Sequence, residues 1–341
     1  MTKRICWCGA HELQTFSAEY ARCSDCGTLV SLVGLSDAEL QVSNDEADFY
    51  GRQYWLEHQS ADLGFPSIFQ RSRNDLTDRN LHWLRTLLRY RLPPAKVLEL
   101  GCSHGSFVGL LHLAGYESAG VEMSPWVVEY AKKTFGIPIS VGPVETLEIQ
   151  PESLDVIALM DVLEHLPDPV GTMAHALRLL KPDGLLLIQT PQFKEEMKYE
   201  ELVSTNGAFL EQFKSDEHLY LFTQDSARRL FSQLGAEHIV FEAPMFPQYD
   251  MFFVVSKLPI ATAPEGAIDE ALASTPGQRF VQAMLDLEGR VRSLDNQIKT
   301  IDADRAERLD QINKLTAMVH ERDVLLQERR ERGILGRAFK K

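Results

Sequence analysis

The sequence predicts an α/β protein whose central domain is a doubly wound, mainly parallel β-sheet. A short apolar run, 97–100, ends in a turn of small residues, 101–105, and a segment with helically spaced apolar residues, 106–114, follows. Patterns of strand and helix then alternate as far as residue 256. After residue 279 the apolar residues adopt the spacing of one long helix. These three observations predict an α/β domain with a short N-terminal and a long C-terminal addition.

The composition is that of a chain able to bury a large core. Of the 341 residues, 44% are hydrophobic, which is enough for one large domain with appendages. The 49 acidic residues outnumber the 35 basic ones and give a net charge of −14, which disfavours a nucleic acid substrate. The first residues lack the apolar core of a signal peptide, and no stretch reaches the length of a membrane span. We therefore expect a cytoplasmic protein.

Residues 1–45 are predicted to form a small zinc-binding cap. Four of the five cysteines lie in this segment, namely Cys6, Cys8, Cys23 and Cys26. Two closely spaced pairs of thiolates suit a tetrahedral Zn²⁺ site, and a full set of protein ligands makes such a site structural. His11 is an alternative to Cys8, because the first pair is one residue shorter than the usual spacing. The alternative for the whole segment is a cap with four free thiols.

Residues 46–94 are predicted to form a helical extension that acts as a lid. The aromatic cluster 49–55 either packs internally or covers a bound small molecule, and Tyr54 is the candidate substrate contact in it. Apolar residues recur at helical spacing over 71–92, and Pro93 follows as a helix breaker. We expect this helix to pack on the edge of the sheet.

Residues 95–258 contain the seven predicted strands and the helices that connect them. The strands are predicted at 96–100, 118–122, 138–141, 154–160, 184–190, 236–243 and 250–256. The helices are predicted at 106–114, 125–135, 169–180 and 223–234. The alternation predicts parallel strands, and we expect the last strand to insert antiparallel.

The C-terminal part is predicted to be a linker at 259–279, a coiled coil at 280–332 and a basic tail at 333–341. The heptad seam consists of Met284, Leu287, Val291, Leu294, Ile298 and Ile301, and of Ile312, Leu315 and Val319 after an interruption by two arginines. Because the sequence offers this seam no partner, we expect a homo-oligomer. The alternative is a helix that packs on its own domain.

Two coupled signals in the predicted sheet indicate a nucleotide-like ligand. Gly101 and Gly105 allow a tight turn between the first strand and its helix. Glu122 ends the second strand about twenty residues later, the offset at which an acid binds a ribose diol. A nicotinamide enzyme would use the same pair, so the loop after the fourth strand decides between cofactors.

That loop reads Asp-Val-Leu-Glu-His-Leu over 161–166, and a Leu-Lys-Pro-Asp-Gly turn follows at 180–184. With the glycine turn and Glu122, these motifs make residues 95–256 resemble class I S-adenosylmethionine (SAM)-dependent methyltransferases. The resemblance implies a seven-stranded Rossmann-like methyltransferase sheet and SAM as cofactor. Ser103 stands where the family usually has a glycine.

The resemblance also implies the positions that hold the cofactor. They are Glu99, Gly101 and Gly105 around its methionine half, Glu122 at its ribose with Met123 beside it, Pro143 and Val144 near its adenine, and Met160 and Asp161 on the other side. Met160 has the alternative of being plain core, and the loop that carries Glu164 and His165 has the alternative of being purely structural.

A second Glu-His pair, Glu217 and His218, follows the fifth strand, where we expect the substrate. Histidine suits proton removal from a hydroxyl, and an adjacent acid orients such a ring. We expect His218 to be the base, Glu217 to orient it and His165 to contact the substrate; the alternative is a structural His218. With the N-terminal cysteines, this pair is similar to zinc-bearing methyltransferases of nucleotide-linked sugars, although the chain carries a coiled coil instead of their large C-terminal domain.

The function predicted from the sequence is therefore SAM-dependent methyl transfer to a small polar acceptor, a sugar or a related metabolite. One alternative is a SAM-binding scaffold that acts through its coiled coil. Another is a protein or RNA methyltransferase, which the acidic charge and the lack of a basic groove disfavour.

Overall fold

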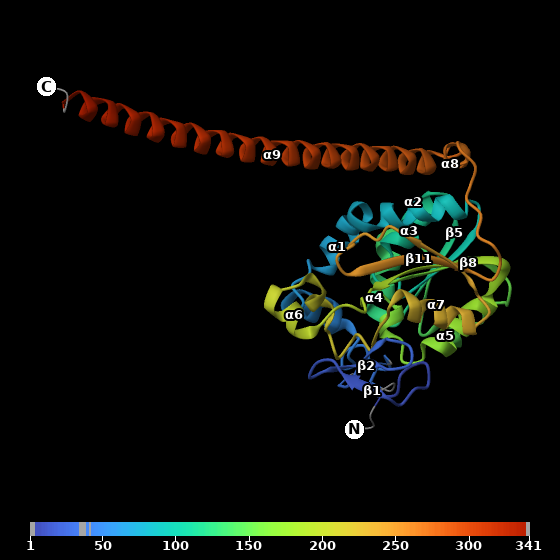
Figure 1. The fold of residues 1–341 in the computed structure, drawn as a ribbon. Helices are drawn as coiled ribbons and strands as arrows, with labels where there is room; N and C mark the ends of the chain where they lie inside the picture. The colour runs from blue at the N-terminus through green and yellow to red at the C-terminus, as the bar shows by residue number, and fades with distance from the viewer. Residues whose placement is uncertain (1–3, 34–38, 41, 339–341) are drawn as a thin grey trace. The chain divides into compact units, whose positions relative to one another are not determined.

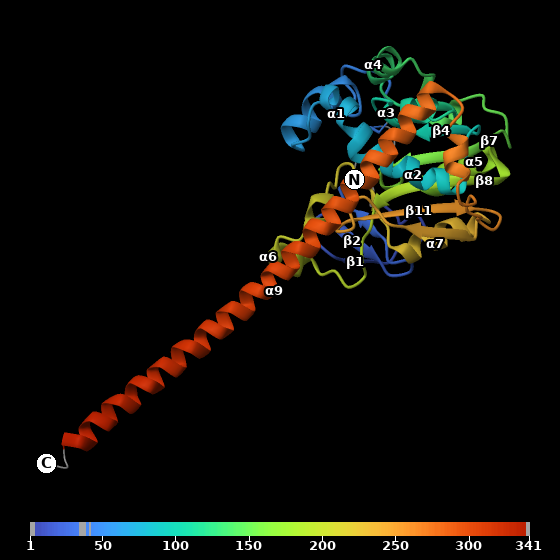
Figure 2. The ribbon, with the colours of Figure 1, turned by 90° about the horizontal axis from the view of Figure 1, so that it is seen from above.

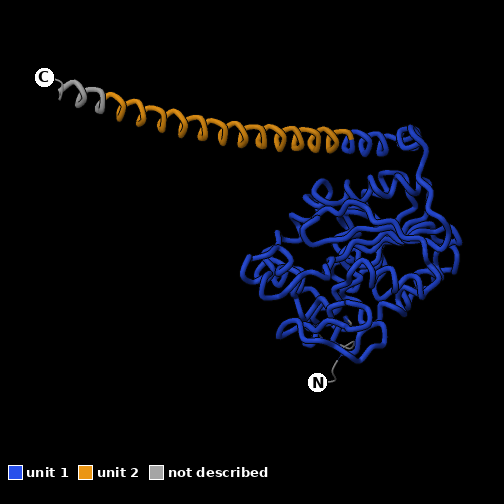
Figure 3. The backbone as a smooth tube through the Cα atoms, viewed as in Figure 1, with its two compact units in different colours: residues 1–285 blue, residues 286–341 orange. Residues whose placement is uncertain are grey.

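The computed structural model describes residues 4–33, 39–40 and 42–338, and of these the side chains up to residue 330. The chain divides into two compact units, residues 1–285 and residues 286–341 (Figure 3). Part of the predicted zinc-binding cap and the end of the predicted basic tail lie outside the described residues.

The first unit is built around a seven-stranded sheet with the order β10-β11-β8-β7-β4-β5-β6 (Figure 1). The strands are β4 (Lys96–Leu100), β5 (Glu117–Glu122), β6 (Ile139–Val141), β7 (Leu154–Met160), β8 (Leu180–Pro191), β10 (His238–Glu242) and β11 (Asp250–Ser256). The pairings among β4 to β8 are parallel, whereas β11 pairs antiparallel with both β8 and β10. The predicted doubly wound sheet and its antiparallel last strand are confirmed.

The strand order reverses at β4, which lies between β5 and β7. The chain therefore leaves β4 in one direction and β7 in the other, and the loops after these strands separate at their carboxyl ends. Open α/β sheets bind ligands in the crevice that forms at such a point.

Helices cover both faces of this sheet, as Figures 1 and 2 show. They are α2 (Leu81–Tyr90), α3 (Ser106–Leu113), α4 (Pro125–Phe135), α5 (Pro169–Leu179) and α7 (Gln224–Gln233). Neighbouring residues of β7 point to opposite faces of the sheet. Ile157 packs with α5 and α7 on one face, and Val156 packs with α2 and α3 on the other. Predicted and observed helix ends agree within one residue for α3, α4, α5 and α7.

The helix predicted at 71–92 is longer and less regular than expected. It consists of α1 (Ile68–Asp75), a π-helical stretch η2 (Leu76–Asn80) and α2, and it ends before the predicted proline stop. Its packing differs from the prediction, because α2 lies on the face of the sheet rather than on its edge. Trp83 shows this, since its indole N–H donates to Oε1 of Gln189 on β8 at 2.9 Å.

The N-terminal cap contains a small antiparallel sheet of the order β1-β2-β3-β9. Its strands are β1 (Leu13–Thr15), β2 (Tyr20–Cys23), β3 (Leu29–Ser31) and β9 (Tyr220–Leu221). The last of these comes from the segment that follows β8, so the cap and the segment that carries His218 form one sheet. The predicted lid contributes the π-helical η1 (Tyr54–Asp62), and the insertion after β8 contributes α6 (Tyr199–Thr205) and the short 3₁₀ helix η5 (Ala208–Gln212).

The predicted linker at 259–279 is partly helical. It contains α8 (Ala267–Ala271), and α9 (Pro276–Ala338) begins four residues before the predicted start of the coiled coil. The composition of this segment predicted a linker. Leu272 within it, and Val281 and Leu285 just after it, are buried in the same hydrophobic cluster as α2, so the segment packs on the domain.

The coiled-coil segment is one continuous helix, as predicted, and its partner stays a prediction. Beyond residue 285 the apolar seam is exposed, at Leu287, Val291, Leu294, Ile298, Ile301, Ile312, Leu315 and Val319. A search of the described residues finds no helix whose length and apolar content would let it cross a membrane.

Candidate active site

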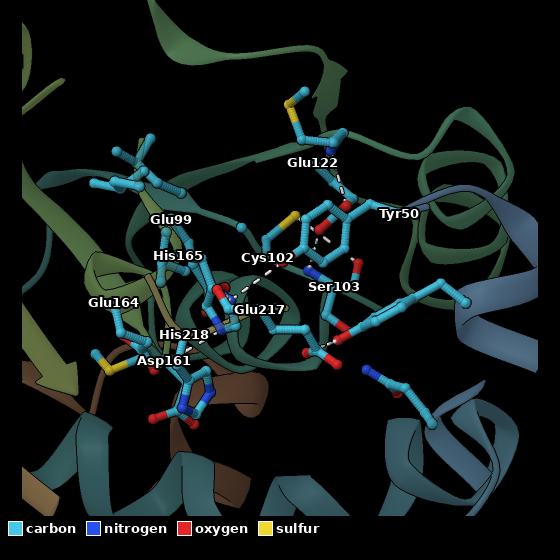
Figure 4. Close-up of a pocket in the computed structure, with 18 of the residues that line it drawn as sticks. Tyr50, Glu99, Cys102, Ser103, Glu122, Asp161, Glu164, His165, Glu217 and His218 are labelled. Carbon is cyan, nitrogen blue, oxygen red and sulfur yellow. Dashed lines mark hydrogen bonds and ion pairs between the residues drawn. The ribbon is translucent and has the colours of Figure 1, made fainter. Parts of the chain in front are cut away.

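A cavity of about 860 Å³ lies at the carboxyl ends of β4, β5 and β7 (Figure 4). Residues from the lid, from the loop after β7 and from the segment before β9 complete its wall. Most of the sequence-predicted site residues line this one cavity: Tyr54, Glu99, Gly101, Glu122, Met123, Pro143, Val144, Met160, Asp161, His165, Glu217 and His218. Met160 is also part of the core cluster below α2, so both interpretations of this residue hold.

The turn after β4 has left-handed backbone at three positions, with φ of +65° at Gly101, +49° at Ser103 and +76° at Gly105. A side chain at Gly101 would meet Val162, because a Cβ placed there lies 2.6 Å from that residue. Gly105 is not among the described residues that line the cavity. Its lack of a side chain is instead required for packing, since a Cβ there would lie 2.9 Å from Ile137.

Glu122 joins the two loops on one side of the cavity. Its carboxylate accepts hydrogen bonds from the backbone N–H groups of Ser103 at 3.0 Å, Met123 at 2.8 Å and Ser124 at 3.2 Å. Burial raises the pKa of this carboxyl, and the three N–H donors oppose the shift. The carboxylate is thus held in one orientation at the cavity wall.

Asp161 leaves β7 with a φ of +58°, an uncommon conformation for aspartate. Its carboxylate accepts from Nε2 of Gln189 at 3.0 Å and pairs with Arg79 at 3.1 Å. Arg79 comes from the π-helical η2 and lies over the ring of Phe246. Sequence analysis missed Arg79, because the helical pattern around it gave no sign of the π-helical turn.

Two further carboxyls at this end of the cavity are buried. Burial raises the pKa of Glu164 to about 8 and that of Asp250 to about 9, and the charge of Asp161 adds to both shifts. Glu164 accepts from the hydroxyl of Thr190 at 2.9 Å through Oε2, while its Oε1 has no hydrogen-bond partner among the described residues. Asp250 was not singled out from the sequence, because it is brought here only by the antiparallel insertion of β11.

The rings of His165 and His218 pack edge to face, with centroids 4.8 Å apart and an angle of 77° between the rings. Nδ1 of His165 lies 2.9 Å from the main-chain oxygen of Glu217, and Nδ1 of His218 lies 2.8 Å from that of Gln212. A carbonyl oxygen only accepts, so both Nδ1 atoms carry the proton and both Nε2 atoms have a free lone pair. Burial lowers the pKa of both rings, which keeps them neutral.

The expected role of Glu217 in orienting His218 is not what the structure shows. The carboxylate of Glu217 accepts from the hydroxyl of Tyr54 at 2.9 Å and lies 3.0 Å from Nε2 of His58. Adjacent residues in an irregular segment point in different directions, so Glu217 ties η1 to the insertion while a backbone carbonyl orients His218. Burial lowers the pKa of His58, but its two acidic neighbours, Glu217 and Asp62, outweigh this and leave the pKa raised.

Several buried polar atoms at the cavity wall have no hydrogen-bond partner in the described part of the chain. They belong to Trp55, Glu99, Ser103 and Glu164. Such atoms cost free energy unless a ligand or water satisfies them, so their gathering in one cavity indicates a ligand site. Burial and the neighbouring Glu122 raise the pKa of Glu99 well above its ordinary value, and a bound cationic group would oppose this shift.

The four cysteines of the cap form a separate cluster. The Sγ atoms of Cys6, Cys8, Cys23 and Cys26 all lie within 4.8 Å of one another. Cys6 and Cys26 are 3.5 Å apart, and Cys8 and Cys23 are 3.6 Å apart. His11 is exposed and is not part of this cluster, so the structure favours Cys8 as the fourth member.

Part of the chain is similar to known proteins. Residues 70–239, almost half of the chain, match the family described as a methyltransferase domain. Ubiquinone biosynthesis O-methyltransferase of Xanthomonas campestris is 32% identical over 108 residues, which are 30% of this chain and 45% of that protein. The enzyme of the same name from Haemophilus ducreyi is 33% identical over 105 residues, 28% of this chain and 44% of that protein. The chain thus spans less than half the length of these curated relatives.

Solved structures of similar proteins are more distant. A SAM-dependent methyltransferase from Thermotoga maritima is 20% identical, with a TM-score of 0.42 over 56% of this chain and 96% of that one. Phosphoethanolamine N-methyltransferase 2 of Haemonchus contortus, solved with S-adenosylhomocysteine, is 15% identical, with a TM-score of 0.45 over 60% of this chain and 59% of that one.

Proposed function

We propose that the methyltransferase domain carried by residues 70–239 transfers a methyl group from SAM to a hydroxyl of a small polar acceptor. The observation that supports this most is that one cavity unites the glycine turn, Glu122 and the neutral His218. The two curated relatives named above, from Xanthomonas campestris and Haemophilus ducreyi, are O-methyltransferases, which favours oxygen as the acceptor atom. We keep a sugar or a related metabolite as the proposed acceptor class.

The cofactor fits the side of the cavity formed by β4 and β5. Glu122 offers a fixed carboxylate to the ribose hydroxyls, and Gly101 leaves the main chain accessible. The Oε2 atom of Glu99, which lacks a partner among the described residues, offers an acceptor to the ammonium group of the methionine half. SAM supplies an electrophilic methyl whose bond to sulfur breaks with the electron pair staying on sulfur.

The acceptor fits the opposite side, where Figure 4 shows Glu164, His165 and His218 together. The acceptor oxygen forms the new bond to the methyl carbon, and its proton must leave. His218 is the proposed base, because its Nε2 has a free lone pair and its Nδ1 is held by Gln212. The main contribution of the protein to the rate is to place this oxygen in line with the methyl group.

Glu122→Gln tests the cofactor side. The substitution replaces one acceptor oxygen with a donor that faces backbone N–H groups, so we expect SAM to bind at least about 10-fold more weakly. Isothermal titration calorimetry with SAM and S-adenosylhomocysteine measures this. Glu117→Gln on the exposed start of β5 is the matched control and should bind normally. Equal affinities for the two variants would remove Glu122 from the cofactor site.

His218→Ala tests the acceptor side. Loss of a positioned base typically costs about 10²–10⁴-fold in rate, so we expect kcat to fall by this factor while SAM affinity stays within about 2-fold. Turnover is measured against a panel of sugars, nucleotide sugars and phenols. The exposed His112→Ala serves as control. An unchanged kcat in His218→Ala would exclude His218 from proton removal, and SAM binding without turnover on any acceptor would favour the scaffold alternative.

We propose that the cap binds one structural Zn²⁺ through Cys6, Cys8, Cys23 and Cys26. Four thiolates complete a tetrahedron and leave no position for chemistry. The role of this site is to hold β2 and β3, which pair with each other and, through β3, with β9 next to His218.

Metal analysis of Cys23→Ser tests the cap. We expect about one zinc per chain in the wild type, loss of zinc in the variant and a lower melting temperature, because metal binding contributes to folding. Cys102→Ser, which removes a thiol outside the cluster, should keep its zinc. A wild-type protein purified without chelator that contains no zinc would contradict the site.

We propose that α9 associates with α9 of a second copy along the seam defined above. Exposed leucine and isoleucine at a spacing of three and four residues are typical of coiled coils. Leu294→Lys with Ile298→Lys places charges on the seam, and we expect light scattering to show a shift from oligomer to single chain. Asn296→Lys with Ala303→Lys adds the same charge off the seam and should leave the oligomer intact. A wild type that scatters as a single chain would refute the association.

A further inference from the structure

We propose that Glu164, His165 and His218 bind a divalent first-row transition metal ion at the acceptor end of the cavity. The metal would bind the acceptor hydroxyl directly. The metal site itself stands on the geometry of these three side chains, whereas its action on an acceptor rests on the methyl transfer proposed above.

The three side chains present one ligand atom each at the same place. These atoms all lie within 4.8 Å of one another, and Nε2 of His165 is 3.9 Å from Oε1 of Glu164. Ligands bound at about 2.1 Å from a metal lie at most about 4.2 Å apart, so small side-chain rotations complete the set. Figure 4 shows the three side chains converging from the loop after β7 and from the segment before β9.

Both imidazoles are held in the tautomer whose Nε2 atom can bind a metal ion. A metal-bound histidine commonly donates its other ring N–H to a carbonyl or a carboxylate, which fixes the tautomer. His165 and His218 do so through Nδ1 to the main-chain oxygens of Glu217 and Gln212. The hydroxyl of Tyr50 lies 3.2 Å from the same Nδ1 of His165 and adds to its positioning. Both Nε2 atoms are thereby left with a lone pair that can bind a metal.

The third candidate ligand, Glu164, has one carboxylate oxygen without a hydrogen-bond partner in the described residues. Glu164 is 1% exposed and lines the cavity, its Oε2 accepts from Thr190, and its Oε1 has no hydrogen-bond partner in the described residues. Asp161 contributes negative potential beside it, of which its partner Arg79 offsets a part. A dication bound at Oε1 of Glu164 would satisfy this atom and interact favourably with the charge of Asp161.

Two imidazoles and one carboxylate are a ligand set that suits divalent transition metals and leaves coordination positions open. The site therefore differs in kind from the cap, where four thiolates close the coordination sphere. Open positions would admit the acceptor hydroxyl.

Binding to the metal would change how the hydroxyl loses its proton. A metal at this position would make a coordinated hydroxyl more acidic than a free one and would so favour loss of its proton to water. That oxygen forms the bond to the methyl carbon, and the carbon–sulfur bond breaks with its electron pair going to sulfur. With a metal bound, the Nε2 lone pair of His218 would be used for coordination, so its proposed role as the base applies to the metal-free site.

Titration with Mn²⁺, followed by electron paramagnetic resonance of the free ion, tests the site in full-length protein that holds a single zinc per chain, with weakly bound zinc removed by dialysis. Mn²⁺ binds thiolates poorly, so the cap does not interfere. We expect about one Mn²⁺ per chain, and an affinity at least about 10-fold lower in Glu164→Gln and in His218→Ala. The exposed His112→Ala should bind Mn²⁺ like the wild type. SAM binding by each variant, measured in parallel, verifies that it is folded.

The wild type alone offers a second readout that does not depend on any variant. Spin-echo modulation of bound Mn²⁺ should show nitrogen coupling from histidine. Absence of Mn²⁺ binding, binding without nitrogen coupling, or equal affinities in all variants would overturn the proposal. So would full turnover after removal of every metal except the zinc, a result that leaves the proposed methyl transfer intact. Mn²⁺ binding that depends on Glu164 and His218, without turnover of any acceptor, would support the metal site and count against the methyl transfer.

Discussion

The geometry of the cavity depends on one buried carboxylate. Glu122 ends β5, and the three backbone N–H groups that it accepts from belong to the turn after β4 and to the start of α4. The turn after β4 and the loop between β5 and α4 are thereby fixed to each other. Asp45, at the end of the cap segment, accepts from the hydroxyl of Ser124 at 2.8 Å and from the N–H of Trp126 at 2.9 Å. It thereby joins this segment to the same point.

The opposite wall of the cavity depends on the N-terminal cap. The hydroxyl of Tyr20 donates to the main-chain oxygen of His218 at 3.0 Å, and that of Ser31 donates to the main-chain oxygen of Ser215 at 2.7 Å. With the pairing of β3 and β9, these bonds place the segment that carries His218 against the loop after β7. A cap that contributes little to the cavity wall therefore supports the residues that do.

The sheet could be predicted from the sequence because each of its strands has a local signal. Apolar runs bounded by turn residues, such as Leu154–Met160, need no distant partner to be recognised. The strand β9 could not be found in this way, since its two residues gain their structure from a cap strand far away in the chain. The same holds for Glu217, whose contacts with Tyr54 and His58 depend on how the lid folds over the insertion. Residues that the family motif marks were predictable, while the groups that orient them were not.

The carbonyl groups that hold His165 and His218 belong to the main chain. Every residue type carries such a group, so the identities of the side chains at Gln212 and Glu217 do not determine which ring nitrogen is protonated. Evolution can therefore replace these two side chains and keep both tautomers, provided that the path of the backbone is preserved. In relatives of this protein, loop length between η5 and β9 should be a better guide to the state of the two imidazoles than residue identity.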